Sequence, residues 1–506
     1  MATPAVELEG ITKSFGRLRA NDGVSLTVLP GTIHALVGEN GAGKTTLMKT
    51  LFGLYHPDAG VIRLNGEAVR FHSPADALAR GLGMVHQHFM LVRPLTVAEN
   101  ITLAHEITTG PLLDPRRAVT VVRELSQRYG LRVDPEARIE NLSVGEEQRV
   151  EILKALYHGA KILILDEPTA VLTPQETEEL FGVLRSLRSQ GTTVVLITHK
   201  LREVMAISDD VTVMRGGRTV GTRKTAATSI PELAELMVGR PVLLEVEKAE
   251  AKPGAPVLEI DGLSVRDDRG LPAVSELSLA VAAGEIVGIA GVEGNGQNEL
   301  VEALTGLRRW TAGDVRLSGR SLHGLSPRAI AHLGVSHVPA DRWKRGLVLE
   351  YSLEDNLIFG RHDERAFNRG AVLARPAIRT FANERLQEFD VRPPLPLARA
   401  RQLSGGNQQK VIVAREFTRP GPLLIAAHPT RGIDLGAIEF IHKEIVRQRD
   451  AGRAVLLVSA ELAELLTLSD RIAVLYEGRI TFEARPRETD ERELGLHMTG
   501  RRKADA

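Results

Sequence analysis

The same ordered set of short motifs occurs twice along this 506-residue chain, and this repetition constrains the fold more than any other feature. In the first half the motifs lie at residues 38–45, 142–146, 162–168 and 198–199. In the second half they lie at residues 291–298, 403–407, 424–429 and 459–460. Equivalent positions are 253 residues apart in the first motif and 261 apart in the others, so the second copy carries extra residues between its first two motifs. A chain this long also exceeds what one hydrophobic core usually serves, and the duplication predicts two similar domains.

Strand and helix signals alternate within each half. Apolar runs of strand length at 194–197 and 455–458 predict buried parallel strands, and residues 173–189 predict a helix that begins with Pro174 and several acids. This alternation predicts an α/β fold with a mainly parallel core sheet in each half. We expect domains over 1–244 and 257–506, joined by a Lys-, Glu-, Ala- and Pro-rich linker over 245–256.

Bulk composition argues against several classes of partner. Lys plus Arg and Asp plus Glu both number 64, so no net charge favours nucleic acid. Cysteine is absent, which excludes disulfides and thiolate zinc sites and permits a cytosolic location. Residues 1–10 do not resemble a signal peptide, and no apolar run approaches the roughly 18 residues that span a bilayer. Any membrane association is therefore expected to run through partner proteins.

The first motif predicts a phosphate-binding loop, because a strand at 35–37 leads into it and a helix follows it. Glycines let backbone N–H groups converge on phosphate oxygens, and the helix N-terminus adds partial positive charge. We expect Lys44 to reach the β and γ phosphates, and Thr45 and Asp166 to hold Mg²⁺. The predicted nucleotide-binding residues of the loop are Gly38, Glu39, Asn40, Gly41, Ala42, Gly43, Lys44, Thr45 and Thr46.

Four further side chains are candidates for the same site. Glu167 follows the expected metal ligand and could orient or deprotonate an attacking water, while His199 could donate to the γ phosphate. Gln87 ends another apolar run and could contact both the metal and the water. Phe15 offers a flat face for stacking adenine. Each has a plainer alternative from the residues alone: a surface acid, a structural histidine, a polar turn residue and a core aromatic.

These motifs, in this order, resemble those of the ATP-binding cassette proteins over nearly the whole chain. In that family two cassettes close face to face, and each ATP lies between the phosphate loop of one cassette and the signature motif of the other. The tandem arrangement, with its second signature at 403–410 and the segment 429–434, is similar to fused ATPase subunits of bacterial importers for simple sugars and nucleosides. Residues 84–91 and 437–442 are more similar to the nucleoside branch, whose binding component is a basic-membrane-protein-type lipoprotein. The fold implied is two tandem P-loop cassettes, each with a helical subdomain.

The resemblance implies one complete ATP site and one degraded site. The complete site would add second-half residues Ser404, Gly405, Gly406 and Gln408 to the first-half groups. The other would pair residues 291–298 with 143–145, but lysine, threonine, aspartate, glutamate and histidine are replaced there by Gln297, Asn298, Ala427, His428 and Ala460. Asp268 stands where the stacking aromatic is expected, and residues 338–340 replace the glutamine loop.

Two positions depart from the family pattern. Thr173 stands where many cassettes carry an aspartate that couples the two sites, whereas Asp434 is retained in the second half. Ala340 precedes Asp341 where close relatives are expected to carry an acid.

The family implies ATP and Mg²⁺ as cofactors and hydrolysis of ATP coupled to solute import. The expected partners are two transmembrane permeases, which would dock on the apolar segments 88–96 and 347–353, and an extracytoplasmic solute-binding lipoprotein that acts through them. The chain would then lie on the cytoplasmic face of the cell membrane. The alternative is a soluble tandem-cassette ATPase that remodels ribosomes or other assemblies. Such factors usually keep two competent sites and a long charged linker. The sequence does not identify the solute.

Overall fold

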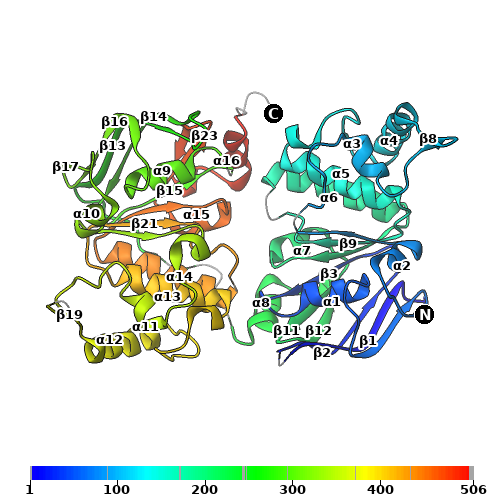
Figure 1. Cartoon of the computed structure of the whole chain (residues 1–506), viewed down its shortest axis with the longest axis horizontal. Coiled ribbons are helices and arrows are strands. Elements are labelled where there is room, and N and C mark those ends of the chain that lie inside the picture. Colours follow the sequence, from blue (N-terminus) through cyan, green and yellow to red (C-terminus); the bar gives the residue numbers. More distant parts are fainter. Residues whose placement is uncertain are drawn as a thin grey trace. The chain divides into compact units, whose positions relative to one another are not determined.

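The computed structural model of the chain describes residues 3–16, 18–87, 89–169, 172–241, 246, 248–292, 294–370, 372–433 and 435–500. The chain divides into two compact units, Met1–Val242 and Leu243–Ala506 (Figure 1). Each unit has a mainly parallel six-stranded sheet, an antiparallel four-stranded sheet and surrounding helices, so the predicted α/β class is confirmed. The exact domain and linker boundaries stay predictions, because residues 242–245 and 247 lie outside the described residues.

The central sheet of the first unit has the strand order β12-β11-β3-β10-β9-β6, in which only β12 is antiparallel to its neighbour. Its strands are β3 (Ile33–Gly38), β6 (Leu82–Val85), β9 (Ile162–Asp166), β10 (Thr193–Ile197), β11 (Asp210–Arg215) and β12 (Arg218–Lys224). The apolar residues of β9 and β10 are buried, as expected for strands covered on both faces. Because Ile197 pairs with Asp166 across the two strands, the segments that follow them start side by side. This register brings the distant motifs together.

Helices and a second sheet surround this core. The helices are α1 (Lys44–Leu51), α2 (Pro74–Ala79), α3 (Val97–Thr102), α4 (Pro115–Tyr129), α5 (Val144–Tyr157), α6 (Pro174–Ser189), α7 (Leu201–Ile207) and α8 (Ile230–Val238). The antiparallel sheet comprises β1 (Val6–Phe15), β2 (Leu18–Val28), β4 (Ala59–Leu64) and β5 (Glu67–Val69). Helices α3, α4 and α5 pack on one another as a helical subdomain, beside the hairpin β7 (Thr108–Thr109) and β8 (Leu112–Leu113). Helix α6 confirms the predicted helix, with Thr173 as its N-cap and Pro174 in its first turn.

The second unit repeats this topology strand for strand. Its central sheet has the order β18-β21-β22-β15-β23-β24. The strands are β15 (Ile286–Ala290), β18 (Val335–Val338), β21 (Leu423–Ala427), β22 (Ala454–Val458), β23 (Arg471–Tyr476) and β24 (Arg479–Ala484). The antiparallel sheet comprises β13 (Pro256–Arg266), β14 (Pro272–Ala282), β16 (Trp310–Leu317) and β17 (Arg320–Ser321), and a hairpin joins β19 (Asn368–Arg369) to β20 (Val372–Leu373). The predicted duplication therefore extends to the whole sheet order.

The helices of the second unit follow the same sequence. They are α9 (Gln297–Leu304), α10 (Pro327–His332), α11 (Leu353–Leu357), α12 (Arg375–Glu388), α13 (Gly405–Phe417), α14 (Leu435–Asp450), α15 (Leu462–Leu468) and α16 (Glu491–Met498). A π-helical turn, η3 (Arg342–Gly346), lies between β18 and α11. This turn accounts for part of the extra residues that the second copy carries between its first two motifs.

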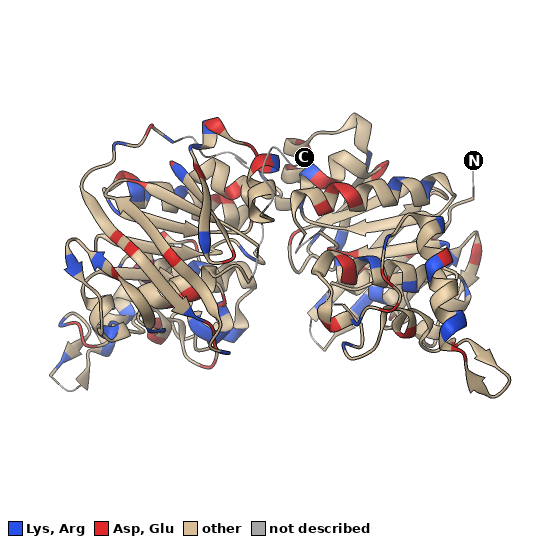
Figure 2. Cartoon of the chain, turned by 90° about the horizontal axis from the view of Figure 1, so that it is seen from above, with Lys and Arg blue, Asp and Glu red and all other residues tan. Residues whose placement is uncertain are grey.

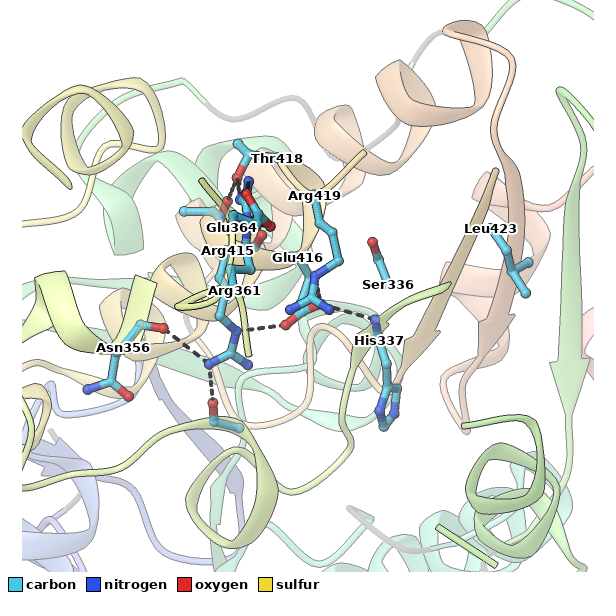
Figure 3. Close-up of polar contacts among 12 residues, drawn as sticks. Ser336, His337, Asn356, Arg361, Glu364, Arg415, Glu416, Thr418, Arg419 and Leu423 are labelled. Atoms are coloured by element: carbon cyan, nitrogen blue, oxygen red, sulfur yellow. Dashed lines mark hydrogen bonds and ion pairs between the residues drawn. The ribbon is translucent and has the colours of Figure 1, made fainter. Parts of the chain in front are cut away.

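The second unit also encloses a charged cluster around Glu416 (Figure 3). Glu416 is buried and accepts a hydrogen bond from Arg415 at 2.6 Å and one from the His337 backbone N–H at 3.3 Å. The residues at the equivalent positions of the first unit include Met84 and Ala155, both buried. The two cores therefore differ in chemistry although their strands follow one plan.

Acidic and basic residues are interspersed along the elements of both units (Figure 2). This distribution agrees with the equal numbers of acidic and basic residues. Among the described residues, no helix has both the length and the apolar character required to span a bilayer.

Candidate functional site

The phosphate loop of the first unit runs from the end of β3 to the start of α1, as predicted. Gly41 and Gly43 have φ angles of 83° and 96°, a region that disfavours other residues. A Cβ on Gly38 would lie 2.3 Å from the backbone oxygen of Met214, and one on Gly43 would lie 2.4 Å from that of Ala20. These glycines are therefore required by backbone conformation and by close packing.

Lys44 lies inside this loop rather than extending into solvent. Its Nζ donates to the backbone oxygens of Gly38 at 2.7 Å and Glu39 at 3.0 Å, and the residue is 5% exposed. Burial lowers the pKa of Lys44, while the carboxylates of Glu167 and Asp166 oppose that shift. The ammonium is thus held where the phosphates of a nucleotide bind in loops of this type.

Thr45 and Asp166 meet at the end of the central sheet. The Thr45 hydroxyl donates to Asp166 Oδ1 at 3.3 Å. Asp166 is 3% exposed, and burial raises its pKa even though the Thr45 hydroxyl and Lys44 favour the charged form. A hydroxyl beside a carboxylate is an oxygen donor set of the kind that Mg²⁺ prefers.

Glu167 is the centre of a hydrogen-bonded group. Its Oε1 lies 3.0 Å from His199 Nδ1, and its Oε2 accepts from Gln87 Nε2 at 3.1 Å. Burial alone would raise the pKa of Glu167, but the hydrogen bond and charge of His199, together with Lys44, bring it below the ordinary value. The carboxylate is therefore kept in its proton-accepting form. Gln87 therefore contacts the site through its hydrogen bond to Glu167.

The backbone at Glu167 is strained. Its φ angle is 50°, which is uncommon for a residue other than glycine, and its N–H donates to the Ile197 oxygen at 2.9 Å. This bond ties the segment after β9 to the end of β10, where His199 follows.

Phe15 lies at the end of β1, away from the sheet core. It is 43% exposed and packs edge-on against Tyr55, with 5.2 Å between ring centroids. The ammonium of Lys13 lies 5.6 Å from its centroid. The exposure favours a stacking platform over a core residue, and Tyr55 is a neighbour that the sequence did not single out.

The second unit keeps the backbone of this site and loses its chemistry. Gln297, at the lysine position, turns its Nε2 back onto the Val292 oxygen at 3.1 Å. His428, at the position equivalent to Glu167, has a φ angle of 45°, and its N–H donates to the Val458 oxygen at 2.7 Å. Ala427 stands at the end of β21 in the position equivalent to Asp166. Glu293 of this loop lies outside the described residues.

The second signature lies at the start of α13. Ser404 caps this helix by accepting from the Asn407 N–H. A Cβ on Gly405 would lie 2.9 Å from a guanidinium nitrogen of Arg342, which donates through its other terminal nitrogen to the backbone oxygen of Gly432 at 3.2 Å. Arg342, which sequence analysis did not identify, therefore lies beside the start of the signature helix.

Gln408 is buried within the second unit, and both ends of its amide are engaged there. Its Oε1 accepts from Trp343 Nε1 at 3.0 Å, and its Nε2 donates to the Ala400 oxygen at 3.1 Å. Its predicted contact with nucleotide remains a prediction.

The signature of the first unit has an exposed valine where the second signature has a glycine. Val144 is 42% exposed, and a Cβ on Gly145 would lie 2.7 Å from a carboxylate oxygen of Glu176. Of the two coupling positions in the family pattern, Thr173 caps α6, while Asp434 lies outside the described residues.

Comparisons with known proteins identify the family of the chain. The family model described as ABC transporter matches residues 21–170 and 274–431. The chain is 52% identical over 501 residues to the guanosine import ATP-binding protein NupO of Bacillus subtilis (strain 168), which covers 99% of this chain and 98% of that protein. It is 48% identical over 495 residues to the nucleoside import ATP-binding protein NupA of Lactococcus lactis subsp. cremoris (strain MG1363), with 98% of each chain covered.

Among solved structures, the fold is similar to the complex of archaeal ribosomal stalk protein aP1 and archaeal ribosome recycling factor aABCE1. The TM-score is 0.61 and the identity 20%, with 95% of this chain and 90% of that chain covered. At this identity the likeness shows the fold alone. The family match, the full-length relatives and the phosphate loop together lead to one conclusion: the chain belongs to the ATP-binding cassette transporter family and is an ATPase.

Proposed function

We propose that this chain is the ATP-hydrolysing subunit of a nucleoside importer and that it works with one complete ATP site. The observation that carries the proposal is the difference between the two units at three equivalent positions. The first unit has Lys44, Asp166 and Glu167. The second has Gln297, Ala427 and His428. The relatives named for guanosine and nucleoside import, at about half identity over nearly the full chain, support the solute class. The ribosome-directed alternative has no comparable support.

The complete site would join the first unit to the second signature. Lys44 and the loop N–H groups would bind the phosphates, and Ser404, Gly405 and Gly406 would approach the γ phosphate from the other cassette. Two adjacent glycines permit the closest approach of backbone to phosphate. The first signature carries Val144 at the corresponding position and would face the degraded site.

Magnesium fits the complete site through oxygen donors. Thr45 and Asp166 would hold the ion, and the remaining ligands would come from phosphate oxygens and water. Among the described residues, no group of three or more His, Cys, Asp or Glu side chains could hold a metal ion. When bound, Mg²⁺ supplies positive charge that offsets charge on the phosphates.

Hydrolysis would proceed by attack of water on the γ phosphorus. The water oxygen forms a bond to phosphorus, the bond between the γ phosphorus and the β–γ bridging oxygen breaks, and ADP leaves with that oxygen. Glu167 accepts the proton of the water. His199 and Gln87 hold the two oxygens of this carboxylate in place, which makes the base rigid before nucleotide arrives.

Two permeases would dock on the segments that follow Gln87 and Ala340. In the first segment Met90 is 65% exposed, and in the second Tyr351 is 51% exposed; His88 lies outside the described residues. Each segment lies at a contact with a signature helix: Glu151 accepts from the Met90 N–H at 2.6 Å, and Arg415 donates at 2.9 Å to the oxygen of Gly346, the residue directly before the second segment. Movement of a signature helix would therefore move a docking segment.

Reconstitution tests this function. The chain is coexpressed with the two permeases expected beside it, the complex is placed in lipid vesicles with its binding protein, and ATP-dependent uptake of radiolabelled guanosine and ribose is measured. We expect guanosine uptake that Lys44→Ala abolishes. Absence of a complex with permeases, together with ATP-dependent cosedimentation with ribosomes, would contradict the importer function. Uptake of ribose in place of guanosine would contradict the solute class alone.

A further inference from the structure

Glu203 connects the two loops that carry the catalytic groups of the first unit. It lies in the first turn of α7, and its carboxylate accepts from the Thr169 hydroxyl at 2.6 and 2.7 Å. The same carboxylate accepts from the Thr198 hydroxyl at 3.2 Å. The side chain of Glu203 is 11% exposed, so these contacts are shielded from competing water.

The two threonines are close neighbours of the catalytic pair. Thr169 lies two residues after Glu167, and Thr198 directly precedes His199. Lys200 strengthens the connection, because its backbone N–H donates to the Thr198 hydroxyl at 3.0 Å and its Nζ donates to the Thr169 oxygen at 3.2 Å. The loop after β9 and the loop after β10 are thereby held to one carboxylate.

The backbone conformation of Glu167 depends on the contacts of its loop. A residue at a φ angle of 50° persists only where the surroundings enforce it. The contact between Glu167 and His199 also needs both loops at a fixed separation, and misplacement of a catalytic group by about 1 Å can lower a rate by about 10²-fold. Glu203 touches neither the nucleotide loop nor the reacting carboxylate, so its influence on catalysis would run through position.

We infer that Glu203 is a positioning residue for ATP hydrolysis: it sets the distance and orientation between the general base Glu167 and His199. This inference rests on the catalytic roles proposed above for those two residues.

The second unit contains a matched connection with no catalytic pair to position. Glu464, 261 residues after Glu203, accepts from the Thr430 hydroxyl at 2.8 Å, and its carboxylate lies 3.0 Å from His442 Nε2. It is 5% exposed, so its removal disturbs a comparably buried network. The loops that it joins carry His428 and Ala460 in place of the acid and the histidine. Glu464 therefore provides a control for the structural effect of losing such a carboxylate.

The test compares Glu203→Ala with Glu464→Ala in the full chain by steady-state ATP hydrolysis. We expect Glu203→Ala to lower kcat by about 10- to 100-fold, in line with a misplaced base, and to leave the KM for ATP within about threefold. Glu464→Ala should keep both parameters within about twofold. Glu203→Gln, which retains one oxygen acceptor for the threonine hydroxyls, should recover part of the lost kcat.

Equal losses in the two alanine variants, or a rise in KM with kcat unchanged, would overturn the inference. If Glu203→Ala does not fold, Thr169→Val and Thr198→Val remove the hydroxyls at nearly constant volume and should lower kcat in the same way; unchanged kcat in both would also overturn it. Glu167→Gln serves as the reference. Unchanged turnover in that variant would refute the proposed role of the base, whereas a loss there with normal Glu203→Ala turnover would refute the positioning role alone.

Discussion

Removing the carboxylate of Glu416 should destabilise the second unit strongly. The side chain of Glu416 is 8% exposed and that of Arg415 is 5% exposed, and they lie 2.6 Å apart (Figure 3). Arg419 approaches the same carboxylate at 3.8 Å. Glu416→Ala leaves these guanidinium groups buried without their acid. Breaking a buried ion pair by removing one partner typically costs about 3–5 kcal/mol.

This loss of unfolding free energy corresponds to a measurable decrease in the Tm of the second unit. For a unit of this size, 1 kcal/mol shifts Tm by about 2–4 °C, so the calorimetric transition of the second unit should fall by roughly 6–20 °C. Glu384→Ala is a matched control, because Glu384 is 58% exposed and pairs with Arg385 at 3.5 Å. An exposed pair of this kind contributes about 0–1 kcal/mol.

The effect should also depend on pH. Burial alone would raise the pKa of Glu416, but Arg415 and Arg419 lower it below the ordinary value. A lowered folded-state pKa contributes stability above the unfolded-state pKa, and this contribution is lost as pH falls through the folded-state value. The difference between wild type and Glu416→Ala should thus be largest near neutral pH and shrink in acid. A loss below about 1 kcal/mol at neutral pH, or a difference that grows in acid, would refute this reasoning.

Four further predictions concern the site. Glu167→Gln should lower turnover by about 10²- to 10⁴-fold while ATP still binds, as measured by phosphate release and fluorescent-nucleotide titration. Because the pKa of Glu167 is lowered, wild-type turnover should persist in acid below the usual carboxyl pKa and be lost only as pH falls through the lowered value; a loss above the usual value would contradict this assignment. Gly43→Ala should weaken ATP binding, since its Cβ would lie 2.4 Å from a backbone oxygen, whereas Gly130→Ala, with open space around it, should bind ATP normally. Arg342→Ala should raise the KM for ATP, because it removes the hydrogen bond to the Gly432 oxygen beside Gly405, and an unchanged KM would show that this contact does not serve the site.

Much of the fold and of the first-unit site could be predicted from the sequence, because the motifs depend on local chemistry. The glycines of the loop are dictated by φ angles and close packing, and the strand that ends at Asp166 is a short apolar run. Fixed spacing between the two copies then predicted the duplicated domains. These features need no knowledge of which distant segments touch.

The remaining features depend on tertiary packing between distant segments. Glu203 looks like an ordinary acid in the first turn of a helix, and the pairing of β9 with β10 brings it to Thr169, 34 residues away in the sequence. The spacing of 261 residues between Glu203 and Glu464 was a usable signal. Gln408 is polar and lies beside the signature, and such a residue is expected to be exposed. Its burial against Trp343 depends on the η3 turn, which no local pattern indicated.

Paired turnover measurements on Lys44→Ala and Gln297→Ala test the central claim, that one of the two duplicated sites hydrolyses ATP. In the full chain, Lys44→Ala should abolish turnover, because it removes the ammonium that we propose binds the phosphates at the complete site. Gln297→Ala should keep most of the wild-type rate, because it alters a loop whose unit lacks the metal-binding acid and the base. Comparable losses in the two variants would contradict the account.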